Sequence, residues 1–399
     1  MRFDGWIWRL LVAAALLYFL VRGPWRALQD SGDFLTVFAA SRCLIHGMNP
    51  YAVNDLVECG RAAGAPVSAD QLRAMPSVYP PPALLLLSPL ALFPWNLAKI
   101  AWLGCSLAAS LWGAMGIGRL AKSWMFPSWT SLLLLAFAPL HTGMSKGQPS
   151  VLVCALIIGS VAVPQPYVAG ALLGLAACIK PQLALGFLCL ALIRQEGRKL
   201  ASACATALLF CGVALAWLKP GSLPALLAGL SQVATGSGVN SGSAENLYRF
   251  QLINVETIIP QVSNSLVLLA AIYAILAVVS FMAIRKADSP LALAVVASAT
   301  VLIGYHRFYD AQILWLAVPA LLAVQRRVSL ALSLLFAVFL VPGQTMAATW
   351  FTPQANGLRF FLLLHHETLA CVALWLIFSG VAIRQHRRLA QPALAEART

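Results

Sequence analysis

An acidic residue opens the segment GDFLTVFAASRCLIHGMNPY, which runs from Gly32 to Tyr51 directly after an apolar run. The segment continues as a short amphipathic pattern that is interrupted by Arg42 and His46 and stops at Gly47, which predicts a short helix. We expect this helix to lie along a membrane surface, with Asp33 in its first turn. A carboxylate there could take a proton from a hydroxyl group. Asp33 could instead only stabilise the helix N-terminus by its charge or as a cap, and spacing leaves both open.

Lys180 is a charge in the middle of an apolar run, AGALLGLAACIKPQLALGFLCLALIR. An ionisable group at membrane depth costs at least about 2.5 kcal/mol, so it is normally paired or functional. Pro181 follows it and would break a helix. Lys180 therefore either extends from a helix break to the interface or binds a lipid phosphate or another anion. The run from Tyr167 to Ile193 is accordingly one span or two short helices.

A third group combines a cation, an imidazole, a phenol and a carboxylate in the stretch YHRFYD, which holds His306, Arg307, Tyr309 and Asp310. Such a group at a membrane interface could bind a phosphate. Basic and aromatic residues also serve as simple interfacial anchors. The spacing of His306 and Asp310 would place both on one face of a helix, which favours a functional pair.

Several common catalytic motifs are missing from the sequence. It has no glycine-rich nucleotide loop, Walker lysine, D-x-D pair or Ser-His-Asp order. Most of the nine cysteines lie in apolar runs, and none forms a C-x-x-C pair, so we predict no metal site and no cofactor, although a divalent metal is not excluded. Cys43 and Cys59 both fall in the first long loop and could pair if that loop faces an oxidising compartment.

The composition is that of an integral membrane protein. Of 399 residues, 60% are hydrophobic and 10% are charged, against roughly 25% charged residues in soluble domains. The formal net charge of +14 would suggest nucleic acid in a soluble protein, but much of it lies in short loops, where membrane topology explains it. We expect no nucleic-acid partner. The first apolar run lacks a signal-peptide cleavage site, so we expect it to remain as a helix.

Apolar runs long enough to be helices recur along the whole chain. They cover about 6–22, 79–93, 96–118, 128–141, 150–163, 167–193, 200–218, 263–284, 291–305, 311–324, 328–342 and 366–383. We predict an all-α bundle of about 12 transmembrane helices (range about 10–13) with short interfacial helices in the first exterior loop. The whole chain, 1–399, would form a single polytopic domain.

The basic residues set the expected orientation. An inside N-terminus places these residues in the cytoplasm: Arg194, Arg198, Lys199, Arg285, Lys286, Arg326, Arg327, Arg384, Arg387 and Arg388. Both termini are then cytoplasmic, and the long segments 23–78, 219–262 and 343–365 lie outside. Arg119 and Lys122 would lie outside against the rule, so the parity between 119 and 193 stays open. The Gly- and Ser-rich stretch 231–250 is a plain linker or an acceptor gate.

Short motifs occur in a characteristic order along the chain. G-D-F-x(3)-F-A-A-x(3)-L-x-H-G-x-N-P-Y is followed by Y-P-P-P, S-P-L, G-Q-P-S, A-G-x(3)-G-x(5)-K-P and H-x-x-Y-D. Together they resemble glycosyltransferase family 87, over about 32–319. The resemblance implies a polytopic bacterial plasma-membrane enzyme of the GT-C architecture. Such an enzyme transfers mannose or another sugar, with inversion, from a polyprenyl-phosphate donor to a hydroxyl of an extracytoplasmic glycan or glycolipid.

The resemblance also implies roles for individual residues. Asp33 is the expected general base, and His306 lies where the family has a histidine near the donor phosphate. Further expected donor-phosphate or lipid-binding residues are Lys180, Arg307 and Arg42, and the expected substrate-binding residues are Tyr51, Tyr79, Gln148, Tyr309 and Asp310. Family members often have G-Q-x-N where this chain has Gly147-Gln148-Pro149-Ser150.

Two other functions fit part of the pattern. A secondary transporter would also have broken helices and a charge at membrane depth, but we find no internal repeat. A surface-polysaccharide ligase or polymerase would be expected to have Arg and His in a large late exterior loop, whereas 219–262 has Arg249 and no His. The transferase hypothesis requires that Asp33 and His306 converge on one extracytoplasmic cavity that is open to the lipid.

Overall fold

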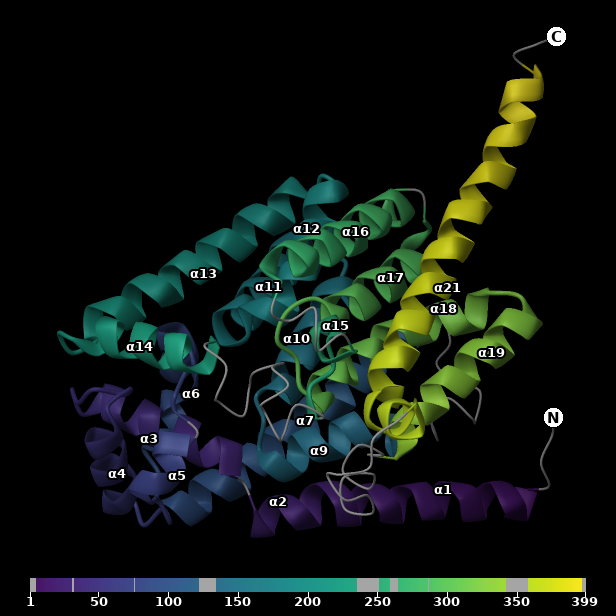
Figure 1. Cartoon of the computed structure of the whole chain (residues 1–399). Helices are drawn as coiled ribbons and strands as arrows, with labels where there is room; N and C mark the ends of the chain where they lie inside the picture. Colours follow the sequence, from purple (N-terminus) through teal and green to yellow (C-terminus); the bar gives the residue numbers. More distant parts are fainter. Residues whose placement is uncertain are drawn as a thin grey trace.

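A computed structural model describes residues 5–30, 32–74, 76–121, 134–234, 251–258, 265–285, 287–341 and 358–396, and these ranges contain helices and no strand (Figure 1). The first half of the chain has α1 (Gly5–Leu20), the π-helical turn η1 (Val21–Trp25), α2 (Arg26–Gln29), α3 (Gly32–Ile45), α4 (Val53–Ala62), α5 (Ala69–Ala74), α6 (Pro81–Ala91), α7 (Trp95–Leu120), α9 (Ala138–Lys146), α10 (Ser150–Ala162), α11 (Pro166–Ile179) and α12 (Pro181–Ile193). The second half has α13 (Gly197–Trp217), α14 (Ser222–Ala234), α15 (Val255–Ile258), α16 (Leu266–Ile284), α17 (Ser289–Leu302), the 3-10 helix η3 (Phe308–Ala317), α18 (Val318–Ala323), α19 (Arg326–Ala337), η4 (Val338–Leu340) and α21 (Leu358–Glu396).

Five helices within the described ranges are long and apolar enough to cross a membrane. They are Trp6–Gln29, Trp95–Leu120, Gly197–Trp217, Val267–Ile284 and His365–Gln385. Seven apolar helices are shorter, including α10, α11, α12 and α17. The chain is therefore an all-helical integral membrane protein, and the count of about 12 spans stays a prediction.

The first long loop folds into a compact cluster of α3, α4, α5 and α6, in purple and blue at the lower left of Figure 1. Side chains on nearly every side of α3 are buried. Phe34 stacks against Trp102, with ring centroids 5.2 Å apart. The cluster thus encloses α3, and its position along a membrane surface stays a prediction. Cys43 and Cys59 join α3 to α4 by a disulfide, with a Cα–Cα distance of 5.6 Å.

The apolar run over 79–93, predicted to be a span, belongs to this cluster instead. At the entry to α6, the Tyr51 hydroxyl donates to the Tyr79 carbonyl oxygen at 2.9 Å. At the other end, Arg42 Nη1 donates to the carbonyl oxygen of Ala91 at 2.7 Å. Helix α6 thus begins and ends against first-loop residues, and along its length it packs against α3, α11 and α13. Its eleven residues extend only about 16 Å at 1.5 Å per residue.

Lys180 lies at the tip of a helical hairpin formed by α11 and α12. Pro181 starts α12, and Lys180 is the cap of both helices. The far ends of the two helices, at Pro166 and Gln195, line the same surface depression. The run 167–193 is therefore two short antiparallel helices, as the proline allowed.

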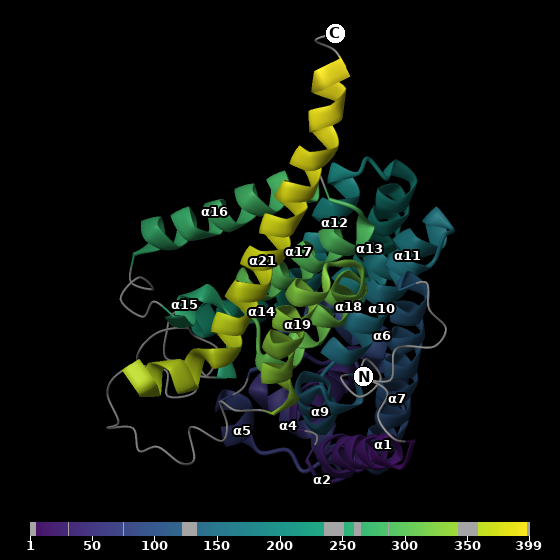
Figure 2. The same ribbon diagram turned by 90° about the vertical axis from the view of Figure 1, so that its right-hand side faces the viewer.

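The hairpin and α6 together change which helix ends in the middle of the chain lie on the same side of the bundle. Helices α7 and α10 run side by side (Figure 2). The α7 residue Trp102 contacts Gly147 just before α10, whereas Gly116, near the end of α7, lies against Ile158. The end of α7 at Arg119 therefore lies on the same side as the basic turn 194–199. The alternation that placed Arg119 opposite this basic turn counted the run 79–93 as a span, whereas the structure has Arg119 and the turn at the same end of the bundle.

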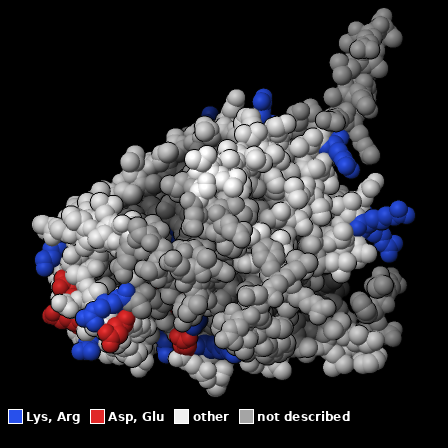
Figure 3. Space-filling model, viewed as in Figure 1, with Lys and Arg blue, Asp and Glu red and all other residues white. Residues whose placement is uncertain are grey.

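Charge is distributed unevenly over the face seen in Figure 3. Acidic and basic side chains mix along the lower left, over the first-loop cluster, whereas the upper right edge shows only Lys and Arg. The start of α1 and the end of α21 both lie toward this basic side in Figure 1. Predictions for Lys122, Lys286, the stretch 235–250 and most of 343–365 lie outside the described residues.

Candidate active site

Asp33 lies in the first turn of α3, and its carboxylate points across the fold to a loop that is more than a hundred residues away in sequence. The side-chain amide of Gln148 donates to Asp33 Oδ2. The Tyr79 hydroxyl in turn donates to Gln148 Oε1 at 3.2 Å. Among the described contacts, Asp33 thus binds a side chain of another element, and Asp30 accepts from the Gly32 amide at the start of α3, at 3.1 Å. This arrangement supports a site residue more than a plain helix cap.

The loop that carries Gln148 has a fixed shape. Helix α9 ends because Gly147 adopts a left-handed conformation, with φ +66°, which glycine adopts at little steric cost. The indole of Trp102 donates to the Gly147 carbonyl oxygen at 2.9 Å. Pro149 then leads into α10, and the buried Gln148 side chain is held toward Asp33.

The stretch 304–310 forms the other side of the site. Gly304, with φ +80°, turns the chain out of α17, and the backbone is extended at Arg307 before η3 begins. Asp310 is fully buried, and its Oδ2 accepts from the Arg307 amide at 3.2 Å and faces His306 Nδ1 at 3.5 Å. His306 therefore precedes the helix and still lies beside Asp310, as their spacing suggested.

The remaining oxygen of Asp310 meets two other elements. Asp310 Oδ1 accepts from Lys180 Nζ at 2.8 Å and from Ser150 Oγ at 2.6 Å. Lys180 Nζ also donates to Ser150 Oγ at 2.7 Å and lies 4.9 Å from the centre of the Tyr309 ring. The buried lysine is therefore paired, which is what burial of a charge in an apolar environment requires.

The charge of Asp33 acts on side chains of both groups. Burial raises the pKa of the Tyr79 phenol well above its usual value, and the charges of Asp33 and Asp310 raise it further. Burial lowers the pKa of Arg307, but the phenols of Tyr305 and Tyr309 and the Asp33 charge outweigh burial and raise it. Because both pKa values are raised, Arg307 stays cationic and Tyr79 stays a neutral donor. Both residues lie in connections, 76–80 and 303–307, outside the spanning helices.

The segment 251–258 closes the site from a third direction, although no site residue was expected in this part of the exterior loop 219–262. The amide of Ile253 donates to the His306 carbonyl oxygen at 2.8 Å. Gln251 Oε1 accepts from Arg307 Nη1 at 3.1 Å, and the Asn254 side chain donates to the Gly304 carbonyl oxygen at 3.1 Å. Tyr305 adds a hydroxyl 2.7 Å from Arg307 Nε. Sequence reasoning missed these residues because short polar side chains in a loop carry no periodic signal.

The expected site residues divide into two groups. The structure brings together Asp33, Tyr79, Gln148, Lys180, His306, Arg307, Tyr309 and Asp310. Arg42 lies apart, because its guanidinium binds the end of α6. Tyr51 contributes indirectly, through its hydrogen bond to the Tyr79 backbone. The His306 ring is fully enclosed, so a cavity shared with Asp33 is not open in this conformation.

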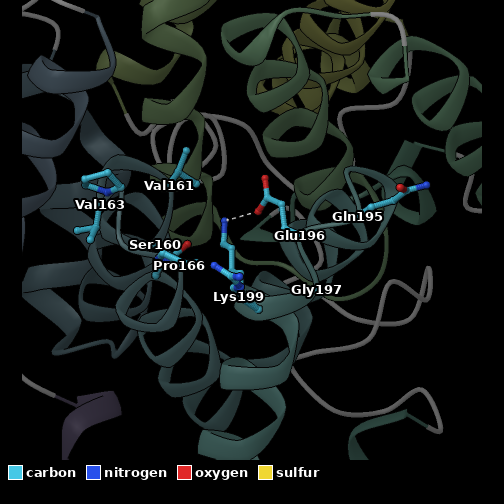
Figure 4. A pocket seen from close by; sticks show the side chains of 11 residues that line it. Ser160, Val161, Val163, Pro166, Gln195, Glu196, Gly197 and Lys199 are labelled. Carbon is cyan, nitrogen blue, oxygen red and sulfur yellow. Dashed lines mark ion pairs between the residues drawn. The ribbon is translucent and has the colours of Figure 1, made fainter.

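A surface depression of about 450 Å³ lies at the opposite ends of the helices that carry the site (Figure 4). Ser160, Gln195, Glu196 and Lys199 are among its lining residues, and Lys199 pairs with Glu196 at 3.1 Å. Because α11 and α12 are 14 and 13 residues long, this depression is about 20 Å from Lys180. It is not part of the candidate active site.

Within the described ranges, no group of three or more His, Cys, Asp or Glu side chains could hold a metal ion. The donors that do converge are cations, phenols and an amide around two carboxylates. Such a set suits an anionic leaving group and a hydroxyl nucleophile better than a redox or nucleotide cofactor.

Comparison with known proteins agrees with this chemistry. A polyprenol-phosphate-mannose-dependent α-(1-2)-phosphatidylinositol pentamannoside mannosyltransferase of Mycolicibacterium smegmatis is 27% identical over 222 residues, which are 54% of this chain and 50% of the relative. The chain thus matches about half the length of that relative. No solved structure matches the chain.

The sequence model of glycosyltransferase family 87 matches residues 78–304, more than half of the chain. The match includes Tyr79, Gln148 and Lys180 and ends just before the stretch that holds His306. Family membership argues against the transporter alternative. The chain belongs to glycosyltransferase family 87.

Proposed function

We propose that this protein transfers a sugar from a polyprenyl-phosphate donor to a hydroxyl group of an extracytoplasmic glycan or glycolipid. The observation that carries the proposal is that the loop 148–150 is bonded at Gln148 to Asp33 and at Ser150 to Asp310, which in turn accepts from the Arg307 amide, although these segments are remote in sequence. A base and an anion-binding group are the two parts that this transfer needs. The proposal involves no cofactor.

The reaction follows from the roles of these two parts. The acceptor oxygen attacks the anomeric carbon while Asp33 takes the hydroxyl proton. The bond between the anomeric carbon and the phosphate oxygen breaks, and its electron pair leaves with the lipid phosphate. Attack from the face opposite the phosphate inverts the anomeric configuration. One carboxylate suffices because a phosphate leaves without a strong acid, unlike the leaving group of a glycosidase.

Arg307 is the best-placed group for the leaving phosphate. It is partly exposed, it stays cationic, and Tyr305 and Gln251 hold its guanidinium in a fixed direction. A guanidinium fork matches phosphate oxygens in geometry. Lys180 is already paired with Ser150 and Asp310, so the geometry gives no support to a direct phosphate contact by that residue.

His306 offers a second contact. Its Nε2 is buried and has no hydrogen-bond partner in the described part of the chain. Buried polar atoms are rarely left unpaired, so an unpaired one suggests a missing ligand or water. A donor phosphate that reached Nε2 would satisfy it, after a small opening of the stretch that encloses the ring.

The basic turns support an extracytoplasmic site. Arg194 at the end of α12 donates to Ser289 at the start of α17, at 3.1 Å, so these turns gather at one end of the bundle. The site lies at the other ends of α10, α11 and α17. If the basic end is cytoplasmic by the positive-inside rule, the site faces outward and both termini face the cytoplasm of a bacterial cell.

The identity of the sugar is drawn from the curated relative. That enzyme is named for a polyprenol-phosphate-mannose donor and a phosphatidylinositol mannoside acceptor. We propose mannose as the first sugar to test and a glycolipid as the first class of acceptor.

The proposal is tested by incubating the purified protein in lipid nanodiscs with separate polyprenyl-phosphate sugars, carrying mannose, glucose or a pentose, and a glycolipid mixture. Released polyprenyl phosphate and sugar-labelled product should form in equal amounts with one donor, and the product should have the inverted anomer. Parallel reactions with a chelator show whether a divalent metal takes part. Transfer from nucleotide sugars but from no lipid-linked donor would reject the proposal.

His306→Ala is expected to weaken donor binding about tenfold, because a hydrogen bond to a charged group contributes about 1.5 kcal/mol or more. Acceptor affinity should change less than twofold. Donor and acceptor dissociation constants, measured separately by native mass spectrometry, check this. The matched control is His46→Ala, since His46 is exposed at the end of α3. A larger loss for acceptor than for donor would contradict the phosphate contact.

A further inference from the structure

A buried triangle of polar side chains joins three elements of the bundle. Ser150 starts α10, Lys180 forms the tip of the α11–α12 hairpin, and Asp310 lies in the first turn of η3. The three pairwise hydrogen bonds are between 2.6 and 2.8 Å long. The side chains of Lys180 and Asp310 are 7% and 0% exposed, and Ser150 is 0% exposed. No substrate atom can reach this triangle without rearrangement of the fold.

Two members of the triangle, Ser150 and Asp310, are connected to groups of the proposed active site. Ser150 follows Gln148 by two positions, and Gln148 donates to the Asp33 carboxylate. Asp310 holds the Arg307 amide with its other oxygen and faces the His306 ring. The triangle thus links the loop that holds the base to the stretch that holds the cation.

Ser150 provides the hydrogen-bonded link between the ion pair and the loop that holds the base. Lys180 and Asp310 attract each other by charge, whereas only the Ser150 hydroxyl, among the described contacts, connects this ion pair to the Gln148 loop. The hydroxyl donates to Asp310 Oδ1 and accepts from Lys180 Nζ, so both of its functions as donor and acceptor are used. Its loss would leave the ion pair in place and remove this hydrogen-bonded connection to the loop.

We propose that Ser150, together with Lys180 and Asp310, is a positioning residue that fixes the distance between the Asp33–Gln148 pair and the phosphate-binding stretch 305–307. The proposal rests on the proposed transferase function and assigns no substrate contact to Ser150 or Lys180. A misplacement of about 1 Å between reacting groups can lower a rate by about a hundredfold. A positioning defect therefore lowers kcat and leaves the donor KM almost unchanged.

The experiment compares Ser150→Ala with Ser150→Thr and Ser160→Ala in nanodiscs. Ser160 lies on the same helix, is buried, and bonds to its own helix, at the Ile157 carbonyl oxygen, at 2.8 Å. We expect Ser150→Ala to lower kcat by about 10- to 100-fold with a donor KM within about twofold of the unchanged protein. Ser150→Thr keeps the hydroxyl and should recover most of the rate, and Ser160→Ala should have little effect. A rise in KM at unchanged kcat would overturn the proposal in favour of a substrate contact.

A double-mutant cycle separates positioning from general loss of structure. If Ser150 acts through the Gln148 loop, adding Ser150→Ala to Gln148→Ala should lower kcat little further, because the position to be fixed is already lost. Independent multiplication of the two losses would overturn the assignment.

Hydrogen exchange gives a measurement that does not depend on turnover. Ser150→Ala should increase amide exchange both in peptides over 145–150 and in peptides over 303–310, while those over 160–170 stay protected. Unchanged exchange at either of the first two places would overturn the coupling. If the unchanged protein transfers no sugar from any lipid-linked donor, the function fails, and exchange still decides whether the triangle couples the two segments.

Discussion

Asp33→Asn is expected to abolish sugar transfer, with kcat lowered by about 10³-fold or more, while donor binding stays within about twofold. General-base catalysis contributes about 10²- to 10⁴-fold to enzyme rates, and asparagine keeps the size of the side chain but cannot accept the acceptor proton. The carbonyl oxygen of the introduced amide could still accept from the Gln148 side chain, in place of the carboxylate oxygen that accepts now. Transfer is measured as product formed per enzyme, and donor binding as the dissociation constant of the polyprenyl-phosphate sugar.

The matched control for this variant is Asp30→Asn. Asp30 is also an acid at the start of the first loop, but it is exposed and pairs with Lys146 at the surface, at 2.6 Å. Surface ion pairs contribute about 0–1 kcal/mol, so this change should leave transfer nearly intact. Substantial turnover by purified Asp33→Asn protein would reject the base assignment, whatever the control does.

Much of the site was predictable from residue type, because charges within or beside apolar runs are rare and require an explanation. Lys180 and Asp310 stood out for that reason, and the structure pairs them. Their partnership was not predictable, since it depends on the hairpin bringing the end of α11 to the start of η3. Sequence spacing reports neighbours on one helix, and this pair is separated by 130 positions.

The run 79–93 shows that an apolar stretch need not be a membrane span. The run 79–93 is as apolar as a span, but the proline-rich entry and the short α6 pack it into the first-loop cluster. Burial within protein and burial in lipid select the same residue types. Arg119 could have revealed the error, because it violated the positive-inside rule only as long as α6 was counted.

Arg42 was expected in the site and lies elsewhere, whereas the segment 251–258 was not expected in the site and lies there. Arg42 looked suitable for a phosphate, but it binds the last carbonyl group of α6, a common use of a cation at a helix end. The segment 251–258 had no expected role, yet it pairs with the backbone of 306–307 and supports Arg307 through Gln251. Tertiary contacts made by backbone groups leave no trace in residue type.

Arg307→Gln is expected to be the second most damaging single change, with donor affinity lowered about 30- to 100-fold and kcat/KM lowered about 10³-fold. Glutamine can still hydrogen-bond, but it removes the positive charge that would neutralise the leaving phosphate. The loss of one fixed donor at a developing negative charge lowers kcat by about 10²- to 10³-fold. Arg307→Lys retains the charge without the guanidinium fork. Its donor affinity should lie between those of the unchanged protein and Arg307→Gln, because lysine does not reproduce a bidentate contact.

The measurements are donor dissociation constants and steady-state kinetics, with thermal unfolding of each variant to exclude loss of fold. Arg73→Gln is the control, since Arg73 is exposed on α5 and pairs only with Asp70, at 2.8 Å, among the described contacts. The expected order of donor affinity is unchanged protein and control first, then Arg307→Lys, then Arg307→Gln. A folded Arg307→Gln protein that binds donor within twofold of the unchanged protein would remove Arg307 from the phosphate site. The unpaired Nε2 of His306 would then be the group to which the phosphate must bind.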